Sequence, residues 1–461
     1  MDSDQAKLPT ATRIVRRPAG AAPVRVSADI CVLGAGIAGV SAALEAARLG
    51  RKVALVDALP ALGGQAVNSI IGTFCGLFAN GTHGIQLTHG IADDILRELG
   101  AQDALHYRRG GPSNTTVVMY DEIALSRWVE EAVRKAGITV LLGAVLRGVA
   151  RDGARIRELD LATRYGDAKL AATGFVDATG DAVLTWEAGF ACREPADGPV
   201  YGTQMMVLEG IDEARQPTRA ELTARARAKA TLYGLVRTDG FAFVFPGRGT
   251  ALVNHTHVET PLEPVAASSN ALLGKAQADK VLHFLKSEYP DAFGQSRVRS
   301  YGLPGIRQTR WIVGRQQLTV KDVRAGMKFS DAVARTAWPI ELHDRLDGYI
   351  WEPFSDDHLH YVPFGSLVPA EADNIVAAGR CIDGDNAALS SVRVMGPCIA
   401  MAPRPRMRST SPAAAACSRS MSRRCASACG ITSSERISLG KSLTAPCRGA
   451  PEGRVSSHEP G

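Results

Sequence analysis

Residues 29–57 read DICVLGAGIAGVSAALEAARLGRKVALVD, and this stretch decides the fold of the first part of the chain. An apolar run from Ile30 to Leu33 predicts a buried parallel strand. Three glycines follow at G-x-G-x-x-G spacing and open a helical pattern, after which a second apolar strand runs from Val53 to Asp57. Strand, helix, second strand and terminal acid fall in register, which is typical of a dinucleotide-binding βαβ unit.

Each part of this motif has a mechanical reason. Gly34 permits the tight turn, Gly36 lets the backbone approach a pyrophosphate, and Gly39 lets helix and strand pack closely. The helix N-terminus supplies free N–H groups and the positive end of the helix dipole. Asp57 lies 23 residues after Gly34, where an acid that binds ribose is expected. We therefore expect a nucleotide to contact Gly34, Gly36, Ile37, Ala38, Gly39 and Asp57.

Three more segments follow downstream. Residues 60–78, PALGGQAVNSIIGTFCGLF, contain a glycine pair; residues 174–184 read GFVDATGDAVL; residues 374–396 read NIVAAGRCIDGDNAALSSVRVMG. In this order the four segments resemble the FAD-dependent oxidoreductases with a glutathione-reductase-type FAD fold. More narrowly, the chain is similar to a family usually labelled only "FAD-dependent oxidoreductase", distantly related to fumarate reductase flavoproteins. The resemblance covers about residues 28–402.

The resemblance implies a non-covalent FAD cofactor. A covalent link is not expected, because no histidine occurs between residues 58 and 82. In the family the last segment leads to a helix whose N-terminus points at the flavin pyrimidine, where a positive dipole favours the reduced ring. The further cofactor-binding residues that the resemblance implies are Gly63, Gly64, Gln65, Thr179, Gly180, Asp181, Gly379, Arg380, Arg393, Met395 and Gly396.

The expected fold class is α/β. A Rossmann-like FAD-binding domain, with a parallel sheet and a β-meander over residues 144–173, is interrupted by an α+β substrate domain. Helical spacing predicts a helix over 122–136, followed by a strand over 138–142. The expected divisions are a flexible leader over 1–27, the FAD-binding domain over 28–194 and 366–402, the substrate or cap domain over 195–365, and a tail over 403–461.

Candidate catalytic residues come from the segment between the two parts of the FAD-binding domain. Arg307 and Arg310 could clamp a carboxylate or stabilise reduced flavin, although either could equally form an ordinary ion pair. Arg393 is the better candidate for stabilising flavin charge. His343 could act as acid or base, oriented by Glu341 or Asp344, or could simply satisfy backbone partners.

Two H-x-H pairs also occur, His255/His257 and His358/His360. Residues two apart on a strand share a face, so each pair could hold a metal, but no third ligand lies nearby and we expect no metal. Substrate contacts from His360 and Tyr361 are the alternative. Cys75 lacks a second thiol at disulfide-reductase spacing, so we interpret it as a packing residue near the cofactor.

Composition is that of a globular protein, with 45% hydrophobic and 22% charged residues. The net charge of +6 is uneven: residues 403–461 carry ten Lys/Arg and three Asp/Glu, which leaves −1 for residues 1–402. We therefore expect no nucleic-acid partner. No apolar run is long enough to span a bilayer and no secretory signal is recognisable, so a cytoplasmic location is expected.

The last 59 residues differ in character from the rest. They hold twelve serines, nine arginines and four cysteines, without helical or strand period. Pro403 and Pro405 would interrupt a helix that MGPCIAM, residues 395–401, begins. A natural disordered tail is one interpretation; a frameshift near codon 402 is the other, and it requires another reading frame that encodes a Gly/Ala-rich helix. In that case flavin retention should be weaker than in a repaired chain.

The sequence thus predicts an FAD-dependent oxidoreductase that moves a hydride between flavin N5 and a small organic substrate, for which the arginines indicate a carboxylate or another anion. A second electron partner must complete the cycle. Two alternatives stay open: a flavin-binding electron-transfer or assembly subunit without substrate chemistry of its own, and a truncated, non-functional product. The substrate, the electron partner and the oligomeric state are not encoded in any recognisable pattern.

Overall fold

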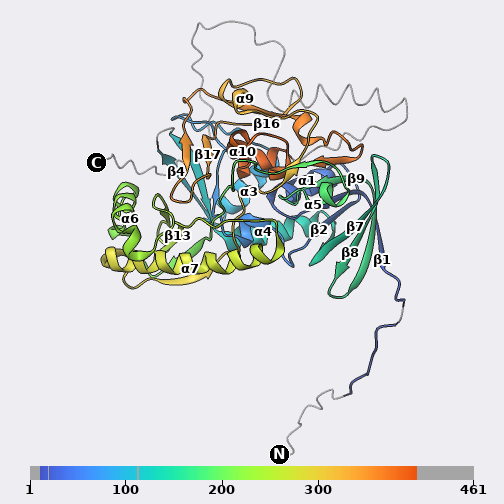
Figure 1. Ribbon diagram of the computed structural model, residues 1–461, viewed down its shortest axis with the longest axis horizontal. Coiled ribbons are helices and arrows are strands. Elements are labelled where there is room, and N and C mark those ends of the chain that lie inside the picture. Colours follow the sequence, from blue (N-terminus) through green and yellow to red (C-terminus); the bar gives the residue numbers. More distant parts are fainter. Residues whose placement is uncertain (1–10, 19, 112–113, 402–461) are drawn as a thin grey trace, which may run out of the picture. The chain divides into compact units, whose positions relative to one another are not determined.

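The computed structural model describes residues 11–18, 20–111 and 114–401 (Figure 1), which belong to one compact unit, residues 1–407. The predicted tail over 403–461 and the first ten residues of the predicted leader lie outside the described residues. Among the described helices, none combines the length and the apolar character that crossing a membrane requires.

The largest sheet has seven strands and holds the first motif. Its order is β6-β2-β1-β9-β8-β7, and β20 pairs with the C-terminal end of β9. Strands β6, β2, β1, β9 and β20 are parallel, whereas β7, β8 and β9 form an antiparallel meander. This is the predicted α/β arrangement. The bounds are β1 Val24–Leu33, β2 Val53–Asp57, β6 Thr139–Leu142, β7 Ala144–Asp152, β8 Arg155–Thr163, β9 Gly166–Asp177 and β20 Ile375–Ala377.

Strand β1 begins earlier than its apolar run. Only Ile30 to Leu33 are buried, yet the strand starts at Val24, where it pairs with Ala168 of β9. Backbone pairing with β9 needs no apolar side chains, so the outer half of the strand carries no hydrophobic signal. The predicted flexible leader therefore contains the first residues of a strand.

Helices α1, α3 and α4 pack together beside β1 and β2 in one hydrophobic core. Helix α1 buries nine of its twelve residues, as the close approach of a βαβ unit requires. Helix α4 matches the helix predicted over 122–136, and Asp121 caps it by accepting from the Ile123 and Ala124 N–H groups. The bounds here are α1 Ile37–Arg48, α2 Gly64–Asn68, α3 Ile91–Gly100, α4 Glu122–Lys135, β3 Thr73–Phe74, β4 Leu105–Gly110 and β5 Thr115–Tyr120.

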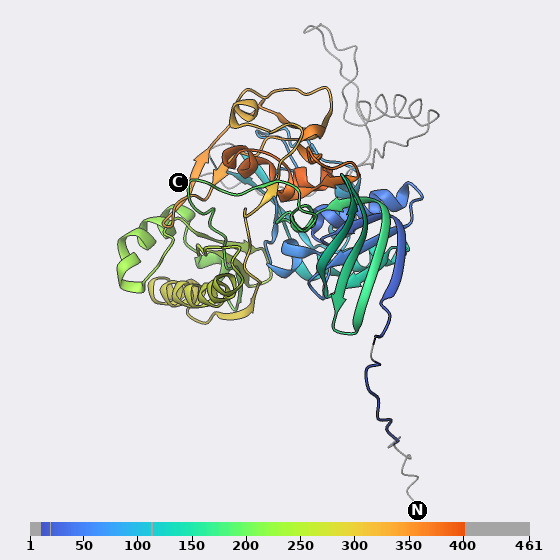
Figure 2. The same cartoon turned by 45° about the vertical axis from the view of Figure 1, so that its right-hand side comes forward.

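A second core lies on the side away from β7 and β8, as Figures 1 and 2 both show. Its four-stranded antiparallel sheet has the order β12-β13-β11-β14, and the helices α6 and α7 contribute buried residues to the same core. The bounds are β11 Met206–Glu209, α6 Arg219–Tyr233, β12 Phe241–Phe245, β13 Thr250–Asn254, α7 Pro264–Glu288, α8 Pro290–Phe293 and β14 Arg297–Tyr301. The proposed domain boundaries at 195 and 365 stay predictions.

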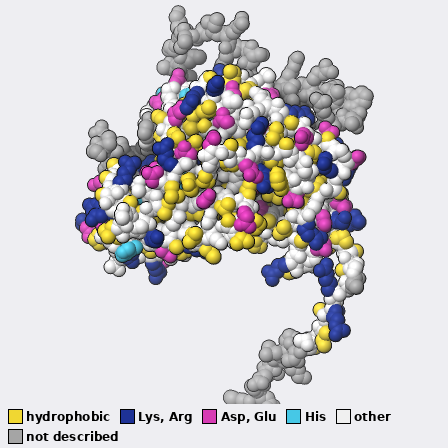
Figure 3. All heavy atoms as spheres, in the orientation of Figure 1, with side chains coloured by type: hydrophobic (Ala, Val, Ile, Leu, Met, Phe, Trp, Pro, Cys, Tyr) yellow, Lys and Arg dark blue, Asp and Glu magenta, His cyan; other side chains and the backbone are white. Residues whose placement is uncertain are grey.

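Most of the remaining elements contribute to a third core. The remaining α-helices and strands are α5 Val183–Glu187, β10 Cys192–Arg193, β15 Trp311–Ile312, α9 Val320–Arg324, β16 Ala332–Thr336, β17 Ile340–Leu342, β18 Ile350–Glu352, β19 His360–Pro363, α10 Asn386–Val392 and α11 Met395–Ala400. On the face in Figure 3, basic and acidic side chains are interspersed, in line with the near-neutral charge of residues 1–402.

Candidate active site

Three of the segments singled out in the sequence meet at the carboxyl end of the seven-stranded sheet. Leu33 of β1 pairs with Asp177 of β9, and Asp177 pairs with Ala377 of β20. The loops that begin at Gly34, Ala178 and Ala378 therefore leave the sheet side by side. Open α/β sheets bind ligands in the crevice outside this edge.

Two glycines of the first loop are required by close contact. Gly34 has a φ of +102°, and a Cβ added to it would lie 2.3 Å from the Ala178 carbonyl oxygen. A Cβ on Gly39 would lie 1.8 Å from the Gly34 carbonyl oxygen. The first loop thus presses against both its own helix and the loop after β9, which is the packing that the motif predicts.

Gly36 has a different environment, and it fits the diphosphate of FAD. A Cβ added there would have Gly64 Cα, at 3.9 Å, as its nearest neighbour among the described residues, so the space in front of Gly36 is open. Gly36 is also the N-cap of α1, and no side chain of the described residues caps the helix. The N–H groups of the first turn are therefore available to an anion, with the helix dipole behind them.

The glycine pair and the acid flank the same loop. Gly63 forms a parallel bridge with Gly36, and a Cβ on Gly64 would lie 2.5 Å from Gly36 Cα. The Asp57 carboxylate accepts from the Leu59 N–H at 2.8 Å and from the Ala35 N–H at 2.5 Å. Each carboxylate oxygen can accept a second hydrogen bond, so Asp57 keeps capacity for a ribose hydroxyl. Gln65 follows in the first turn of α2.

The loop after β9 is organised by a buried acid that the sequence did not single out. Asp177 accepts hydrogen bonds from the N–H and the hydroxyl of Thr179, and from the N–H and the hydroxyl of Thr185. The Gly180 N–H donates to Cys381 Sγ at 3.0 Å. Thr179 is thus held by Asp177, and Gly180 is held against the third segment.

The third segment contacts the other two. Gly379 has a φ of +74°, and a Cβ there would lie 3.0 Å from the Ala38 Cβ in α1. The Arg380 guanidinium lies against Gly180 and is 3.5 Å from an oxygen of Asp181. The predicted cofactor residues of all three segments therefore lie around one edge of the sheet.

Helix α11, which contains Met395 and Gly396, is short in the described part of the chain. The Gly396 N–H donates to the Cys75 carbonyl at 2.9 Å, and a Cβ on Gly396 would lie 2.4 Å from the Gly76 backbone. Met395 packs near the Tyr120 hydroxyl, with its sulfur 3.9 Å away. Cys75 is thus fixed through its backbone, and burial raises the pKa of its thiol.

The three candidate arginines have different environments. Arg310 pairs with Glu194 at 3.1 Å and stacks on the Trp186 ring at 3.9 Å. Arg307 is buried and donates from Nη1 to the Tyr201 carbonyl at 2.7 Å. Burial, Arg237 and Arg393 lower the pKa of Arg307 well below its usual range. Arg393 donates to the Glu341 carbonyl at 3.1 Å.

His343 has no exposed surface, and both of its ring nitrogens are engaged. Nε2 lies 3.1 Å from Glu341 Oε1, and Nδ1 lies 2.8 Å from His257 Nε2. Of the two acids considered for orienting it, Glu341 is the neighbour, whereas Asp344 lies 3.5 Å from Arg345. Burial, followed by the surrounding arginines, lowers the pKa of His343 well below its usual range.

The second histidine pair lies on β19 and the residues before it. His360 Nδ1 is 3.2 Å from His358 Nε2, and His360 Nε2 is 2.9 Å from Ser391 Oγ. Burial lowers the pKa of His360 to about 3. Adjacent strand residues face opposite sides, so His360 points inward and Tyr361 points the other way. Within the described residues no group of three potential metal ligands occurs.

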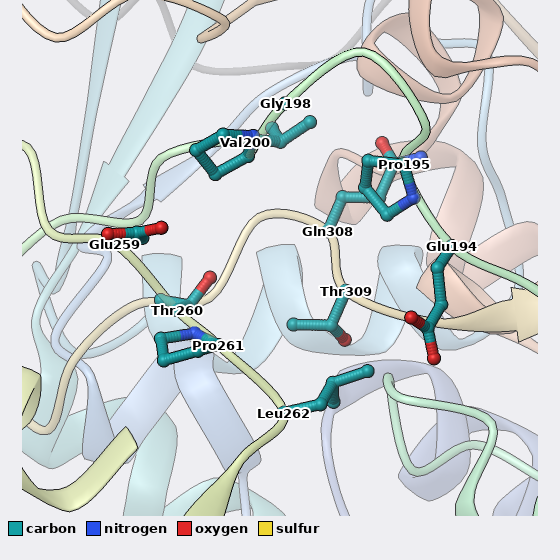
Figure 4. A pocket seen from close by; sticks show the side chains of 11 residues that line it. Glu194, Pro195, Gly198, Val200, Glu259, Thr260, Pro261, Leu262, Gln308 and Thr309 are labelled. Atoms are coloured by element: carbon teal, nitrogen blue, oxygen red, sulfur yellow. The ribbon is translucent and has the colours of Figure 1, made fainter. Parts of the chain in front are cut away.

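A cavity of about 220 Å³ opens beside the loop after β9. Figure 4 shows Gln308, Thr309 and Glu194 on one side of it and Glu259, Thr260 and Pro261 on the other. Thr309 Oγ1 donates to the Asp181 carboxylate at 2.5 Å, which connects the cavity to the cofactor loops. Its charged lining residues are the acids Glu194 and Glu259, so this cavity does not itself attract anions.

Sequence reasoning missed several residues at the centre of this region. Arg237 is fully buried, donates to Asp239 at 2.7 Å and to Asn254 at 2.9 Å, and leaves Nη2 without a partner among the described residues. In the sequence Arg237 precedes Thr-Asp-Gly, a turn pattern, and it belongs to no motif that would indicate a functional residue. The H-x-H spacing marks His257 in the sequence, and the structure places its Nε2 2.8 Å from His343 Nδ1.

A parallel sheet, a helix start open to an anion and three loops gathered at one strand edge define the chain as a dinucleotide-binding α/β protein. The particular class follows from the whole sequence. The model of the FAD dependent oxidoreductase family matches residues 29–404, and the chain belongs to this family. It is an FAD-dependent oxidoreductase and its cofactor is FAD.

Solved structures similar to this chain include two that match most of its length. One is a geranylgeranyl bacteriochlorophyll reductase-like protein from Thermoplasma acidophilum, at 14% identity and a TM-score of 0.42, covering 82% of this chain and 75% of that one. Another is a p-nitrophenol 4-monooxygenase from Pseudomonas putida, at 10% identity and a TM-score of 0.43, covering 88% and 96%. No match to this sequence is found among curated proteins.

Proposed function

We propose that this enzyme transfers a hydride between the N5 atom of its flavin and a small, anionic organic substrate. FAD supplies the redox chemistry when bound; the chain binds and orients the reactants. The observation that carries the anionic substrate is a group of three arginines, Arg237, Arg307 and Arg393. Burial, Arg237 and Arg393 lower the pKa of Arg307 by more than the Glu341 carboxylate raises it, so a further anion among the arginines would relieve their mutual repulsion.

Arg307 is the central residue of this proposal. It is buried, and within the described residues its hydrogen bond goes to a backbone carbonyl and not to a carboxylate. Arg237 pairs with Asp239, whereas Arg393 extends from the C-terminal end of α10 toward β17. A buried cation without a paired carboxylate is costly unless an anion completes the site. Arg307 would therefore hold the substrate's carboxylate or another anionic group.

The remaining predicted residues take these places in the proposal. The segment 195–365 supplies the substrate side, and the segments 28–194 and 366–402 supply the cofactor side. His360 and Tyr361 belong to the strand that leads back toward the cofactor loops, and Arg310 would act at the rim beside Glu194. A quinone, a carrier protein or oxygen would exchange electrons with the flavin in the second half-reaction.

The spectrum of the purified protein gives the first test. Small carboxylic acids, each paired with its amide or methyl ester, would be added to the flavin-loaded protein without oxygen, and the visible absorbance followed. We expect bleaching of the oxidised flavin with an acid and not with its neutral partner. Equal bleaching by both members of a pair would contradict the anionic substrate and leave the assignment to the family unaffected.

Arg307→Gln tests the same proposal at one residue. Loss of a charge-assisted hydrogen bond should weaken binding of the active acid by about 2 kcal/mol, or roughly 30-fold, with flavin content unchanged. Arg307→Lys should recover part of this loss because it keeps the charge. Arg299→Gln, which removes a partly exposed ion pair with Glu122, is the matched control. Unchanged binding by the Arg307→Gln protein would show that the anion is held elsewhere.

A further inference from the structure

A line of hydrogen-bonding groups runs through the interior from Glu341 to Leu346. His343 Nε2 is 3.1 Å from Glu341 Oε1, His343 Nδ1 is 2.8 Å from His257 Nε2, and His257 Nδ1 is 2.9 Å from the Leu346 carbonyl oxygen. Both imidazoles are fully buried, whereas the side chain of Glu341 is 20% exposed. We call Glu341, His343 and His257 the relay.

The number of protons in this line follows from its two ends. The Leu346 carbonyl can only accept, so His257 Nδ1 carries a hydrogen. If His257 is neutral, its Nε2 accepts from His343 Nδ1–H, and a neutral His343 then has no hydrogen left on Nε2. That bare nitrogen faces Glu341 Oε1, which as a carboxylate is also an acceptor. Three hydrogen bonds need three protons, and two neutral imidazoles supply only two.

We propose that the relay holds one proton more than a carboxylate and two neutral imidazoles carry, and that Glu341 exchanges this proton with the substrate. The second half of this statement rests on the proposed hydride transfer. When a hydride from the reduced flavin adds to the substrate, one proton completes the reduction; Glu341 gives it up, the relay is left with one negative charge, and water restores the proton. In the oxidising direction the relay first releases its stored proton to water and then receives one from the substrate.

The surroundings of the relay suit this exchange. Burial lowers the pKa of His343 most, and Arg307, Arg237 and Arg393, which come from three separate segments, lower it further. Tyr349 stacks on His343 with ring centroids 4.6 Å apart, and Tyr201 stacks on His257 at 5.7 Å. With the third proton the relay is neutral overall, which suits a buried site; without it, the negative charge is balanced by the arginines.

Glu341 is the end of the relay nearest the cofactor loops. Its backbone carbonyl accepts from Arg393, which ends α10, and its carboxylate also accepts from Trp338 Nε1 at 3.0 Å. Cys75, which accepts from the Gly396 N–H, is close enough to Glu341 for the carboxylate to raise its pKa. Of the three side chains of the relay, only that of Glu341 has exposed surface.

Native electrophoresis of the flavin-loaded protein at neutral pH tests the stored proton without any substrate. Glu341→Gln should leave the net charge unchanged, because the amide can donate to His343 Nε2 and the third proton is no longer needed. Asp344→Asn removes a neighbouring carboxylate of which 40% is exposed, and it should add one positive charge. In urea both variants should differ from the wild type by one charge, since Glu341 is then ionised.

His257→Phe gives an independent check, because neither side chain is formally charged. Without His257, neutral His343 can donate to the Glu341 carboxylate, so the variant should lose the third proton and become more negative by one charge. If the Glu341→Gln protein had the same native electrophoretic mobility as the Asp344→Asn protein, the proposal of a stored proton would be wrong. Bound flavin absorbance shows that each variant is folded.

Proton exchange with the substrate is tested separately, in the oxidising direction, with the acid identified by flavin bleaching. Glu341→Gln should slow reduction of the flavin by this acid about 100-fold, the usual contribution of a general acid or base, while Asp344→Asn should not. Glu341→Gln should also remove the pH dependence of flavin reduction and leave the flavin content unchanged. A normal rate of flavin reduction in Glu341→Gln would overturn the proton exchange between Glu341 and the substrate. Failure of every acid to bleach the flavin would overturn the proposed function and leave the electrophoretic result standing.

Discussion

At the scale of single residues, Gly34 and Gly36 lie in one turn but should respond differently to alanine. Gly36 has an ordinary φ of −68° and open space before it, so Gly36→Ala should preserve the apoprotein and block the diphosphate. In Gly34→Ala the new Cβ would clash with the Ala178 carbonyl, and alanine would have to adopt a positive φ. We expect the free energy of unfolding to fall by at least about 1–2 kcal/mol. Flavin per chain and thermal unfolding of the apoprotein measure both effects. Normal flavin content in Gly36→Ala would contradict the assigned diphosphate position.

Buried histidines should make stability depend on pH. The pKa of His360 is lowered to about 3 from an ordinary 6.5, so the unfolded chain binds a proton that the folded chain refuses. The buried His360 therefore lowers the free energy of unfolding only below pH 6.5. This loss grows by about 1.4 kcal/mol for each pH unit as the pH falls toward 3.

The effect of His360→Gln on the free energy of unfolding, relative to the wild type, should therefore be about 2 kcal/mol more stabilising at pH 5 than at pH 8. Urea unfolding of both proteins at the two pH values measures this difference. Exposed His83→Gln is the matched control and should behave alike at both pH values. An equal effect of His360→Gln at pH 5 and pH 8 would show that His360 does not cause the pH dependence.

At the scale of elements, Asp177 connects the end of β9 to α5. Its two oxygens accept four hydrogen bonds, two from Thr179 and two from Thr185. In Asp177→Asn the amide nitrogen would face two donors, which should destabilise the fold by about 3 kcal/mol and reduce flavin content, because Thr179 is released. Denaturant unfolding and flavin absorbance measure the two effects. Exposed Asp197→Asn should change neither, and equal behaviour of the two variants would contradict this role.

Elements set by local pattern could be predicted from the sequence. Helix α1 between β1 and β2 follows from glycine spacing and apolar periodicity, and the meander follows from turn residues such as Gly153 and Gly166. The first half of β1 could not be predicted, because its residues are partly exposed and their strand partner is remote in sequence. The order of β11 between β13 and β14 likewise depends on contacts that no local window contains.

At the scale of the whole molecule, the predicted cofactor residues follow from local sequence patterns, whereas the proposed substrate residues depend on contacts between remote segments. The predicted cofactor residues lie mostly in short motifs whose backbone conformation requires glycine, so a local stretch of sequence is enough to predict them. Arg237, His257, Arg307, Glu341 and Arg393 come from five separate segments, and only the packing of three cores brings them together. His343 was singled out, but its neighbour His257 is 86 residues away and could not be assigned to it.

The convergence of three remote loops also determines how FAD should affect stability. Because β1, β9 and β20 end at one edge, a dinucleotide bound there would join segments more than 300 residues apart in the chain. Removal of FAD should lower the unfolding free energy by about 3 kcal/mol when the free cofactor had been present at 100 times its dissociation constant. Thermal unfolding at increasing FAD concentration measures this, and Gly36→Ala, which should not bind the diphosphate, is the control. A melting temperature that rises equally in both proteins would show that FAD stabilises the chain elsewhere than at the glycine turn.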